Sequence, residues 1–280
     1  MIRIPFVKMQ GAGNDYVYLD CTRQPMQDLL ASFTLPALAR RLSNRHYGIG
    51  SDGLVLILPS SVADLQMRMF NADGSEAEMC GNAARCVGKY AYEHGLVGRN
   101  VITLETHAGI RQLTLNIEEN RVQSVAVNMG KPQLLGQVIL PPENIKGLCH
   151  EVYKVSMGNP HAVFFMEEPV EEADLQSIAA SVSAHPSFPE GANVEIVNLL
   201  SAKEVNMRVW ERGAGETLAC GTGACAVAAA AQTKKKADRQ VTIQLPGGAL
   251  MVSRQTDGSL VLTGPAQEVF IGEYLIQKVL

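Results

Sequence analysis

Long apolar runs and aromatic side chains are scarce in this sequence of 280 residues. No stretch approaches the roughly 20 uninterrupted apolar residues that a transmembrane helix needs. Near the N-terminus, Lys8 interrupts the apolar residues before the core of a signal peptide could form. These absences argue against a membrane protein and a secreted one, so the sequence predicts a cytoplasmic location.

Neither sign of charge dominates. The chain carries 24 Lys and Arg against 28 Asp and Glu, a net charge of -4, which gives no broad attraction for nucleic acid or an anionic membrane. The basic run at 234–236 follows an apolar helical stretch, where cations complement the helix dipole. With 46% hydrophobic and 19% charged residues, the composition is that of a globular protein. We therefore expect a small-molecule partner, with no nucleic acid and no membrane.

Cofactor motifs and a disulfide framework are also missing. The sequence contains neither GxxxxGK[ST] nor HExxH, and no pattern for pyridoxal phosphate, so we expect no cofactor and no metal. Six cysteines without a secretion signal are more typical of reduced thiols than of disulfides. Four of them fit ordinary core positions: Cys21, Cys86, Cys149 and Cys225.

What the sequence does contain is an internal repeat. Cys80 and Cys220 lie 140 residues apart, half the length of the chain, and residues 65–87 align with residues 205–227 without a gap and with seven identities. Two further segment pairs, near Val101 and Tyr47, repeat at offsets of 140 and 141. Internal symmetry of this kind predicts two homologous lobes.

The Pro- and Gly-bearing stretch 130–147 is where we place the boundary, which gives an N-terminal lobe at 1–130 and a C-terminal lobe at 131–267. Both halves are rich in strand patterns, and each has a helix starting just after its repeated cysteine. The expected elements are strands at 54–58, 65–70, 101–105, 205–210 and 241–245, and helices at 82–94, after Cys220, at 35–45 and at 171–184. The small apolar residues of the helix after Cys220 suggest sheets wrapped around a central helix.

Each repeated cysteine precedes a helix and is followed by glycine. Unpaired amides and the helix dipole favour negative charge there, so we expect the pKa of the thiol to fall and the amides to bind a carboxylate. Two such thiols suit the inversion of a stereocentre, in which one base removes a proton and an acid on the opposite face returns one. Helix amides would stabilise the developing enediolate-like charge.

Two other readings of the cysteines stay open at this point. A zinc site from Cys80, Cys86, Cys220 and Cys225 is one, although the spacings CxxxxxC and CxxxxC differ from the usual CxxC knuckle. A redox dithiol is the other, but it leaves the surrounding Asn, Glu and Arg residues unexplained.

At these residues the chain resembles the diaminopimelate epimerase family. The resemblance covers nearly the whole chain and rests on these motifs: KMQGAGNDY (8–16), GIGSDGLVL (48–56), FNADGSEAEMCGNAARC (70–86), ETHAG (105–109), MGNPHAVFF (157–165), GANVEIV (191–197), WERGAGETLACGTGACA (210–226) and LTGPA (262–266). Ala83 departs from the CGNG form expected of the first cysteine motif, and its methyl group could narrow a carboxylate pocket.

The resemblance implies an isomerase that interconverts LL- and meso-diaminopimelate without pyridoxal phosphate, in lysine and peptidoglycan precursor synthesis. The alternatives are a related cofactor-independent racemase for another amino acid and a non-enzymatic zinc-binding module. The implied fold is α+β, with two pseudosymmetric lobes, each a mixed β-sheet or barrel around a central helix, and an active site in the interlobe cleft. A C-terminal strand near 268–280 would return to the first lobe, and a homodimer stays open as the oligomeric state.

The resemblance also implies the roles of individual residues. Cys80 and Cys220 would be the acid/base pair, with His161 and Glu211 tuning the thiols. The substrate, diaminopimelate, would be bound by two groups of residues. Backbone amides at the helix starts would hold the reacting carboxylate (Gly81, Asn82, Gly221, Thr222), and side chains would bind the distant amino-acid end (Asn14, Asn71, Asn159, Asn193, Arg212).

Overall fold

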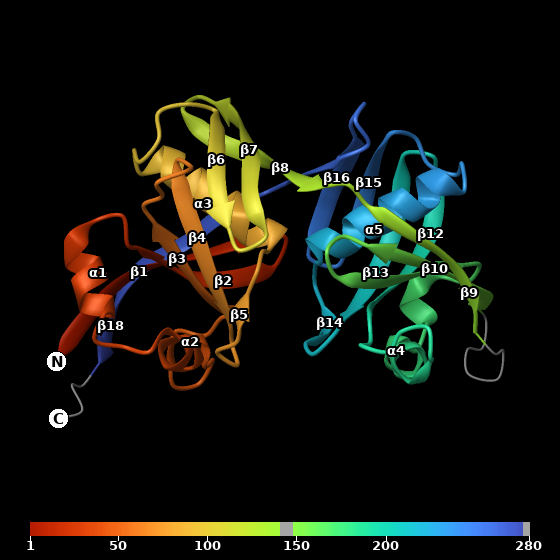
Figure 1. Ribbon diagram of the computed structural model, residues 1–280, viewed down its shortest axis with the longest axis horizontal. Helices are drawn as coiled ribbons and strands as arrows, with labels where there is room; N and C mark the ends of the chain where they lie inside the picture. Colours follow the sequence, from red (N-terminus) through yellow and green to blue (C-terminus); the bar gives the residue numbers. More distant parts are fainter. Residues whose placement is uncertain (141–147, 277–280) are drawn as a thin grey trace. The chain divides into compact units, whose positions relative to one another are not determined.

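The computed structural model describes residues 1–140 and 148–276, and the side chains of 148–150 are outside that description. The chain divides into two compact units. The first comprises Met1–Val127 together with Pro265–Leu280, and the second comprises Asn128–Gly264. Each unit combines a mixed sheet with helices, so the fold class is α+β, as predicted (Figure 1). The predicted boundary segment 130–147 lies partly outside the described residues, as does the Cys149 side chain.

The first unit is built on a mixed sheet. β2 pairs with β3, and β4 with β6, in parallel, and the other pairs are antiparallel. The strands are β1 (Ile2–Gly11), β2 (Asn14–Asp20), β3 (Gly53–Leu58), β4 (Leu65–Asn71), β5 (Glu76–Ala77), β6 (Val101–Thr106), β7 (Gly109–Glu118), β8 (Arg121–Gly130, which runs into the second unit) and β18 (Gln267–Ile276).

Helix α3 (Gly81–Glu93) is the central helix of the first unit. It starts directly after Cys80 and is followed by His94 and by Gly95, whose positive φ of 71° suits glycine at a helix end. Ten of its residues are buried, and it contacts β1, β7 and β18 (Figure 1). Two shorter helices, α1 (Gln24–Leu30) and α2 (Leu35–Ser43), contribute leucines to a separate apolar cluster with β1, β2 and β3.

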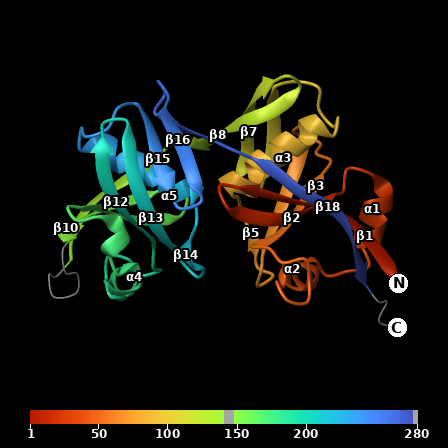
Figure 2. The same ribbon diagram turned by 180° about the vertical axis from the view of Figure 1, so that it is seen from behind.

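The last described strand of the chain completes the sheet of the first unit. β18 runs antiparallel to β1, from the pair Ile2↔Ile276 to the pair Gln10↔Gln267 (Figure 2). One register shift interrupts the pairing, between Lys8 and Met9. The first and last strands of the chain are therefore neighbours in one sheet.

The second unit repeats this plan. β11 pairs with β12, and β13 with β15, in parallel, while its other described pairs are antiparallel. Its strands are β9 (Gln133–Ile139), β10 (Leu148–Ser156), β11 (Pro160–Met166), β12 (Asn193–Ser201), β13 (Glu204–Glu211), β14 (Gly215–Thr217), β15 (Gln240–Leu245), β16 (Gly248–Arg254) and β17 (Leu260–Gly264).

Helix α5 (Gly221–Thr233) is the central helix here. Its residues 224–231 are all 0% exposed, and most of them are alanines. Because these side chains are small, strands can pack closely on several sides, and α5 contacts β10, β11, β12, β15, β16 and β17 (Figure 1). A second helix, α4 (Leu175–Ala184), packs on β12 and β13 and closes a separate apolar cluster.

Most predicted elements are confirmed, with shifted ends. The helix expected at 171–184 begins only at Leu175, because the Asp174 side chain caps it by accepting from the backbone N–H of Ser177; Val170–Glu172 form a separate 3-10 turn. Helix α1 was not predicted, because it has only seven residues.

Candidate active site

In the first unit, Cys80 and two of the predicted asparagines form one hydrogen-bonded group. Cys80 is the N-cap residue of α3, and its Sγ lies 3.5 Å from Oδ1 of Asn14, the first residue of β2. Asn82, on the first turn of α3, donates from Nδ2 to the same oxygen at 3.1 Å. The start of a strand and the start of a helix thus bring a thiol and two amides together.

Two charged residues that were not predicted for the site extend this group. Arg85 is 0% exposed and donates from Nη2 to Oδ1 of Asn82 at 2.8 Å. Asp52, just before β3, accepts from Nδ2 of Asn14 at 2.8 Å and from Arg45 at 2.9 Å. Arg85 belongs to the helix that follows Cys80, but nothing in the sequence pattern shows that its side chain is buried.

The structure does not connect Asn71 to this group by any described hydrogen bond. Asn71 ends β4 and donates from Nδ2 to Oγ of Ser75 at 3.0 Å, which closes the tight turn before β5. Gly81 is the first residue of α3, one residue before the predicted start of this helix.

In the second unit, Cys220 is the N-cap residue of α5. Its Sγ accepts from the backbone N–H of Gly223 at 3.4 Å and lies 3.4 Å from Oγ1 of Thr222. Asn159 donates to the same Thr222 oxygen at 3.4 Å. Gly221 begins the helix. Four of the predicted residues therefore lie together at this helix start.

His161 is buried beside this group and is held at both ring nitrogens. Nε2 lies 3.0 Å from Oδ1 of Asn159, and Nδ1 lies 2.7 Å from Oε1 of Glu195. Glu195 is 0% exposed and was not predicted as a site residue. The signal was available in the segment VEIV, where a charged residue interrupts an apolar strand of the repeat.

Burial dominates the titration of this second group. It raises the pKa of Cys220 well above its ordinary value, and the carboxylates of Glu211 and Glu195 raise it further because they repel a thiolate. The expected fall of the thiol pKa is therefore wrong for Cys220, because desolvation outweighs the helix start. Burial also raises the pKa of Glu211, whose Oε1 accepts from Thr217 at 2.6 Å.

Asn193 and Arg212 lie on adjacent strand ends. Asn193 begins β12, opposite His161 in the parallel pairing with β11, and its Oδ1 accepts from the backbone N–H of Arg212 at 2.8 Å. The Arg212 side chain is exposed and donates to the backbone oxygen of Glu190 at 2.8 Å. Its guanidinium retains donors for an incoming carboxylate.

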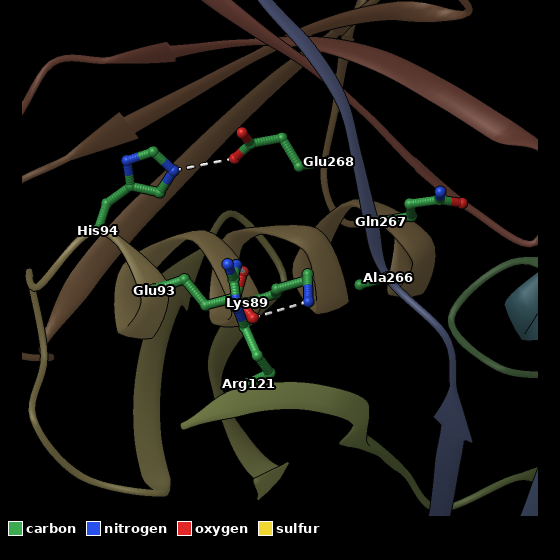
Figure 3. A pocket seen from close by; sticks show the side chains of 7 residues that line it. All are labelled: Lys89, Glu93, His94, Arg121, Ala266, Gln267 and Glu268. Carbon is green, nitrogen blue, oxygen red and sulfur yellow. Dashed lines mark hydrogen bonds and ion pairs between the residues drawn. The ribbon is translucent and has the colours of Figure 1, made fainter. Parts of the chain in front are cut away.

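A separate cavity of about 480 Å³ lies in the first unit and contains none of the predicted site residues (Figure 3). Its polar side chains pair with one another: Lys89 with Glu93 at 2.8 Å, and His94 with Glu268 at 2.9 Å. Both acidic groups are already engaged by neighbouring bases, so nothing here indicates a substrate.

Within the described ranges, no group of three or more His, Cys, Asp or Glu residues is arranged to hold a metal ion. The described residues therefore give no support to a zinc site formed by Cys80, Cys86, Cys220 and Cys225. None of the described helices is long and apolar enough to cross a membrane.

Comparison with known proteins shows that the sequence is similar to one family over nearly its whole length. A family model described as diaminopimelate epimerase matches residues 6–135 and 153–269. A diaminopimelate epimerase from Desulfovibrio desulfuricans is 47% identical over 292 residues, covering 98% of this chain and 99% of the relative. One from Methanococcus maripaludis is 48% identical over 279 residues, covering 96% and 98%.

Solved structures share the fold at low sequence identity. A PhzF-family phenazine biosynthesis protein from Bacillus anthracis aligns with a TM-score of 0.73 at 18% identity, over 99% of this chain and 100% of that one. A probable proline racemase from Agrobacterium radiobacter aligns with a TM-score of 0.67 at 16% identity, over 99% and 94%.

Proposed function

This chain belongs to the diaminopimelate epimerase family, and we propose on that basis that it interconverts LL- and meso-diaminopimelate with Cys80 and Cys220 as its two acid/base groups. One observation carries the assignment of these two residues. Each thiol is the N-cap of the central helix of its unit, at equivalent positions of an internal repeat. The chain is accordingly an isomerase acting on a small molecule.

In the proposed reaction, a thiolate removes the proton from the α-carbon and the other thiol returns a proton to the opposite face. The first sulfur ends as a thiol and the second as a thiolate, so charge and protons balance. Backbone N–H groups of Gly81, Asn82, Gly221 and Thr222 lie at the two helix starts, where the dipole favours an anion. They would hold the carboxylate as its negative charge grows.

The surroundings of Cys220 support a role for it as an acid. Its raised pKa keeps the thiol protonated at neutral pH, ready to be donated to a carbanion. Glu211 and His161 lie in the same buried group and are proposed to tune that thiol. In the Cys80 group, by contrast, the proposed site residues supply only neutral amides.

We assign the distant amino-acid end of the substrate to the predicted polar side chains (Asn14, Asn71, Asn159, Asn193 and Arg212). Exposed Arg212 presents a planar fork that suits a carboxylate. A racemase for a monocarboxylic amino acid would not need this fork. A panel of amino acids therefore separates the two functions: faster inversion of a monocarboxylic amino acid than of LL-diaminopimelate would contradict our choice.

Isotope incorporation tests the two-thiol mechanism. In heavy water, early product should carry deuterium at the inverted carbon while recovered substrate carries little, because the donating thiol exchanges with solvent first.

Cys80→Ser and Cys220→Ser should each abolish measurable inversion, since a hydroxyl is a far weaker acid than a thiol. Cys21→Ser is the matched control, because burial raises the pKa of Cys21 to about 12 and it lies in an apolar cluster of the first unit.

The family assignment leaves oligomeric state and location to be proposed. β18 pairs with β1. Three apolar side chains of β18 lie on the same face of the strand and are exposed: Val269 (53%), Ile271 (62%) and Leu275 (50%). We propose that a second copy covers this face, giving a homodimer. Ile271→Glu should then yield monomers in analytical ultracentrifugation.

The proposed location is the cytoplasm, because the mechanism needs two reduced thiols and the cytoplasm keeps thiols reduced.

A further inference from the structure

The hydrogen bonds around Cys80 form a chain whose two ends have opposite chemistry. At one end, the guanidinium of Arg85 donates to Oδ1 of Asn82 at 2.8 Å. Asn82 then donates from Nδ2 to Oδ1 of Asn14 at 3.1 Å, and Asn14 donates from Nδ2 to Oδ2 of Asp52 at 2.8 Å. A guanidinium can only donate and a carboxylate can only accept, so the chain has a fixed direction.

The direction of the chain determines which atom faces the thiol. If the amide of Asn14 were flipped, its NH2 group would face the NH2 group of Asn82 and its oxygen would face the Asp52 carboxylate. Both contacts would be repulsive. The oxygen of Asn14 is therefore the atom held 3.5 Å from Sγ of Cys80.

We propose that Asp52 is a positioning residue which, opposite the buried donor Arg85, holds the amide oxygen of Asn14 against the Cys80 thiol. The catalytic meaning of this contact rests on the proposed function. An oxygen acceptor at the sulfur stabilises the S–H form over the thiolate, and the same oxygen can accept from an ammonium group of the substrate. Asp52 influences the thiol and the ammonium site only by orienting Asn14, since Asp52 itself makes no described hydrogen bond to the thiol.

The second unit does not repeat this arrangement. Asn193 and Cys225 occupy the positions equivalent to Asp52 and Arg85 in the repeat. Asn193 and Asp52 each accept a backbone N–H, from Arg212 at 2.8 Å and from Asp15 at 3.0 Å, but only Asp52 also accepts a side-chain amide in the described hydrogen bonds. Among the described hydrogen bonds, the chain of contacts that ends at Asn14 occurs beside Cys80, so the two thiols should respond differently to changes in it.

Other titratable and charged groups surround Cys80 and must be kept constant in a test. They come from three places: Tyr18 on β2, Cys86 and Arg85 on α3, and Asp52 before β3. Beyond Asp52, Arg45 binds both Asp52 and Asp15 at 2.9 Å. Changing Arg45 alters the local charge without a described contact to Asn14, which makes it a suitable control.

The pH dependence of Cys80 alkylation by iodoacetamide, followed by peptide mass mapping of the full-length protein, tests the proposal without substrate. In Asp52→Ala, Asn14 keeps only the Asn82 anchor, so its oxygen should leave the sulfur part of the time. The midpoint should fall by roughly half a pH unit, the size of one ordinary hydrogen bond. Arg45→Met is the control for charge at an exposed position. It removes a positive charge, so a purely electrostatic effect would raise the pH midpoint of Cys80 alkylation instead.

A double-mutant cycle with Asn14→Ala decides between a contact and a general charge effect. Asn14→Ala alone should lower the midpoint by a similar amount, and adding Asp52→Ala should change it no further. An equal additional shift in the Asn14→Ala background would overturn the proposal, as would an unchanged midpoint in Asn14→Ala. If the cycle behaves as expected but the protein does not epimerise diaminopimelate, the proposed function fails while the positioning role stands.

Discussion

Glu195 determines how the imidazole of His161 is held. Both side chains are fully buried and 2.7 Å apart, and a buried carboxylate without a partner is costly. With Nδ1 occupied by Glu195, Nε2 is directed at Asn159, which in turn donates to Thr222 beside the Cys220 sulfur. Glu195 thus positions a histidine that the proposed mechanism places next to the thiol.

Glu195→Gln should therefore lower kcat for epimerisation roughly tenfold or more while retaining the fold, since the side chain keeps its size but loses its charge. Glu216→Gln is the matched control, because it removes a carboxylate from a more exposed ion pair with Arg208 at 2.8 Å. Steady-state kinetics and thermal unfolding of both variants are the measurements. Equal kcat losses in the two variants would show that Glu195 has no special role.

Glu211 should control when the Cys220 thiol ionises. Its carboxylate is among the causes that raise the pKa of Cys220, because a nearby negative charge disfavours the thiolate. Glu211→Gln should therefore shift the alkylation of Cys220 to lower pH, so that at a fixed mildly alkaline pH the thiol reacts faster than in the wild type. Mass mapping of Cys220 checks this sign, and slower alkylation would contradict it.

Glu195 was not predicted as a site residue, although its charge interrupts an apolar segment, because the sequence does not show to which side that charge points. In a half-exposed strand, a charged residue between apolar ones points to solvent. β12 is buried on both faces over its first five residues, so Glu195 points into the unit instead. Parallel pairing with β11 and contact with α5 create that burial, and neither can be read from local sequence. The motif cysteines, in contrast, were found because the repeat marks them.

The first turn of α5 fits tightly against the strands beneath it. A Cβ added at Gly223 would lie 2.7 Å from Oε1 of Glu195 and 3.3 Å from Cβ of Cys220. Gly223 is thus required for packing at this helix start, whereas the equivalent position of the first unit holds Ala83. A side chain here would push both Glu195 and the thiol from their positions.

Gly223→Ala should accordingly cost about 1–3 kcal/mol of unfolding free energy and most of the epimerase activity. The control is Gly98→Ala, where an added Cβ meets nothing within 4 Å and the backbone needs no positive φ. Chemical denaturation and initial rates of both variants give the comparison. A fully active, equally stable Gly223→Ala protein would mean that this helix start tolerates displacement.

Elements were predictable where periodicity and caps are local. Helix α3 could be placed because Gly95 follows its end, and strands β4, β6, β13 and β15 follow from apolar alternation. Pairing order could not be placed in the same way. Nothing in residues 14–20 or 53–58 indicates that β2 and β3 run parallel. The parallel direction depends on the connection between the two strands, which contains helices α1 and α2.

The repeat explains why the two units share a plan, and β18 shows where they differ. In the second unit, β10 pairs with β9, the strand that precedes it in the chain. In the first unit the corresponding partner of β1 is β18, from the other end of the chain. Comparing the two halves of the sequence could not show this. β18 stands at the end of the first unit's part of the chain, whereas β9, which has the same place beside β10, stands at the beginning of the second unit.

Ending the chain after Ala266 should therefore damage the first unit selectively. The truncation removes β18, which pairs with β1 over most of its length and contacts the central helix α3. Hydrogen exchange should become faster in β1, β2 and α3, while β12 and β13 of the second unit keep their protection. Glu273→Ala, which breaks only the exposed Arg3–Glu273 pair at 2.8 Å, should leave both patterns intact. Unchanged protection of β1 and α3 after truncation would mean that the first unit holds its cysteine helix without the returning strand, and equal loss in both units would mean that they unfold as one.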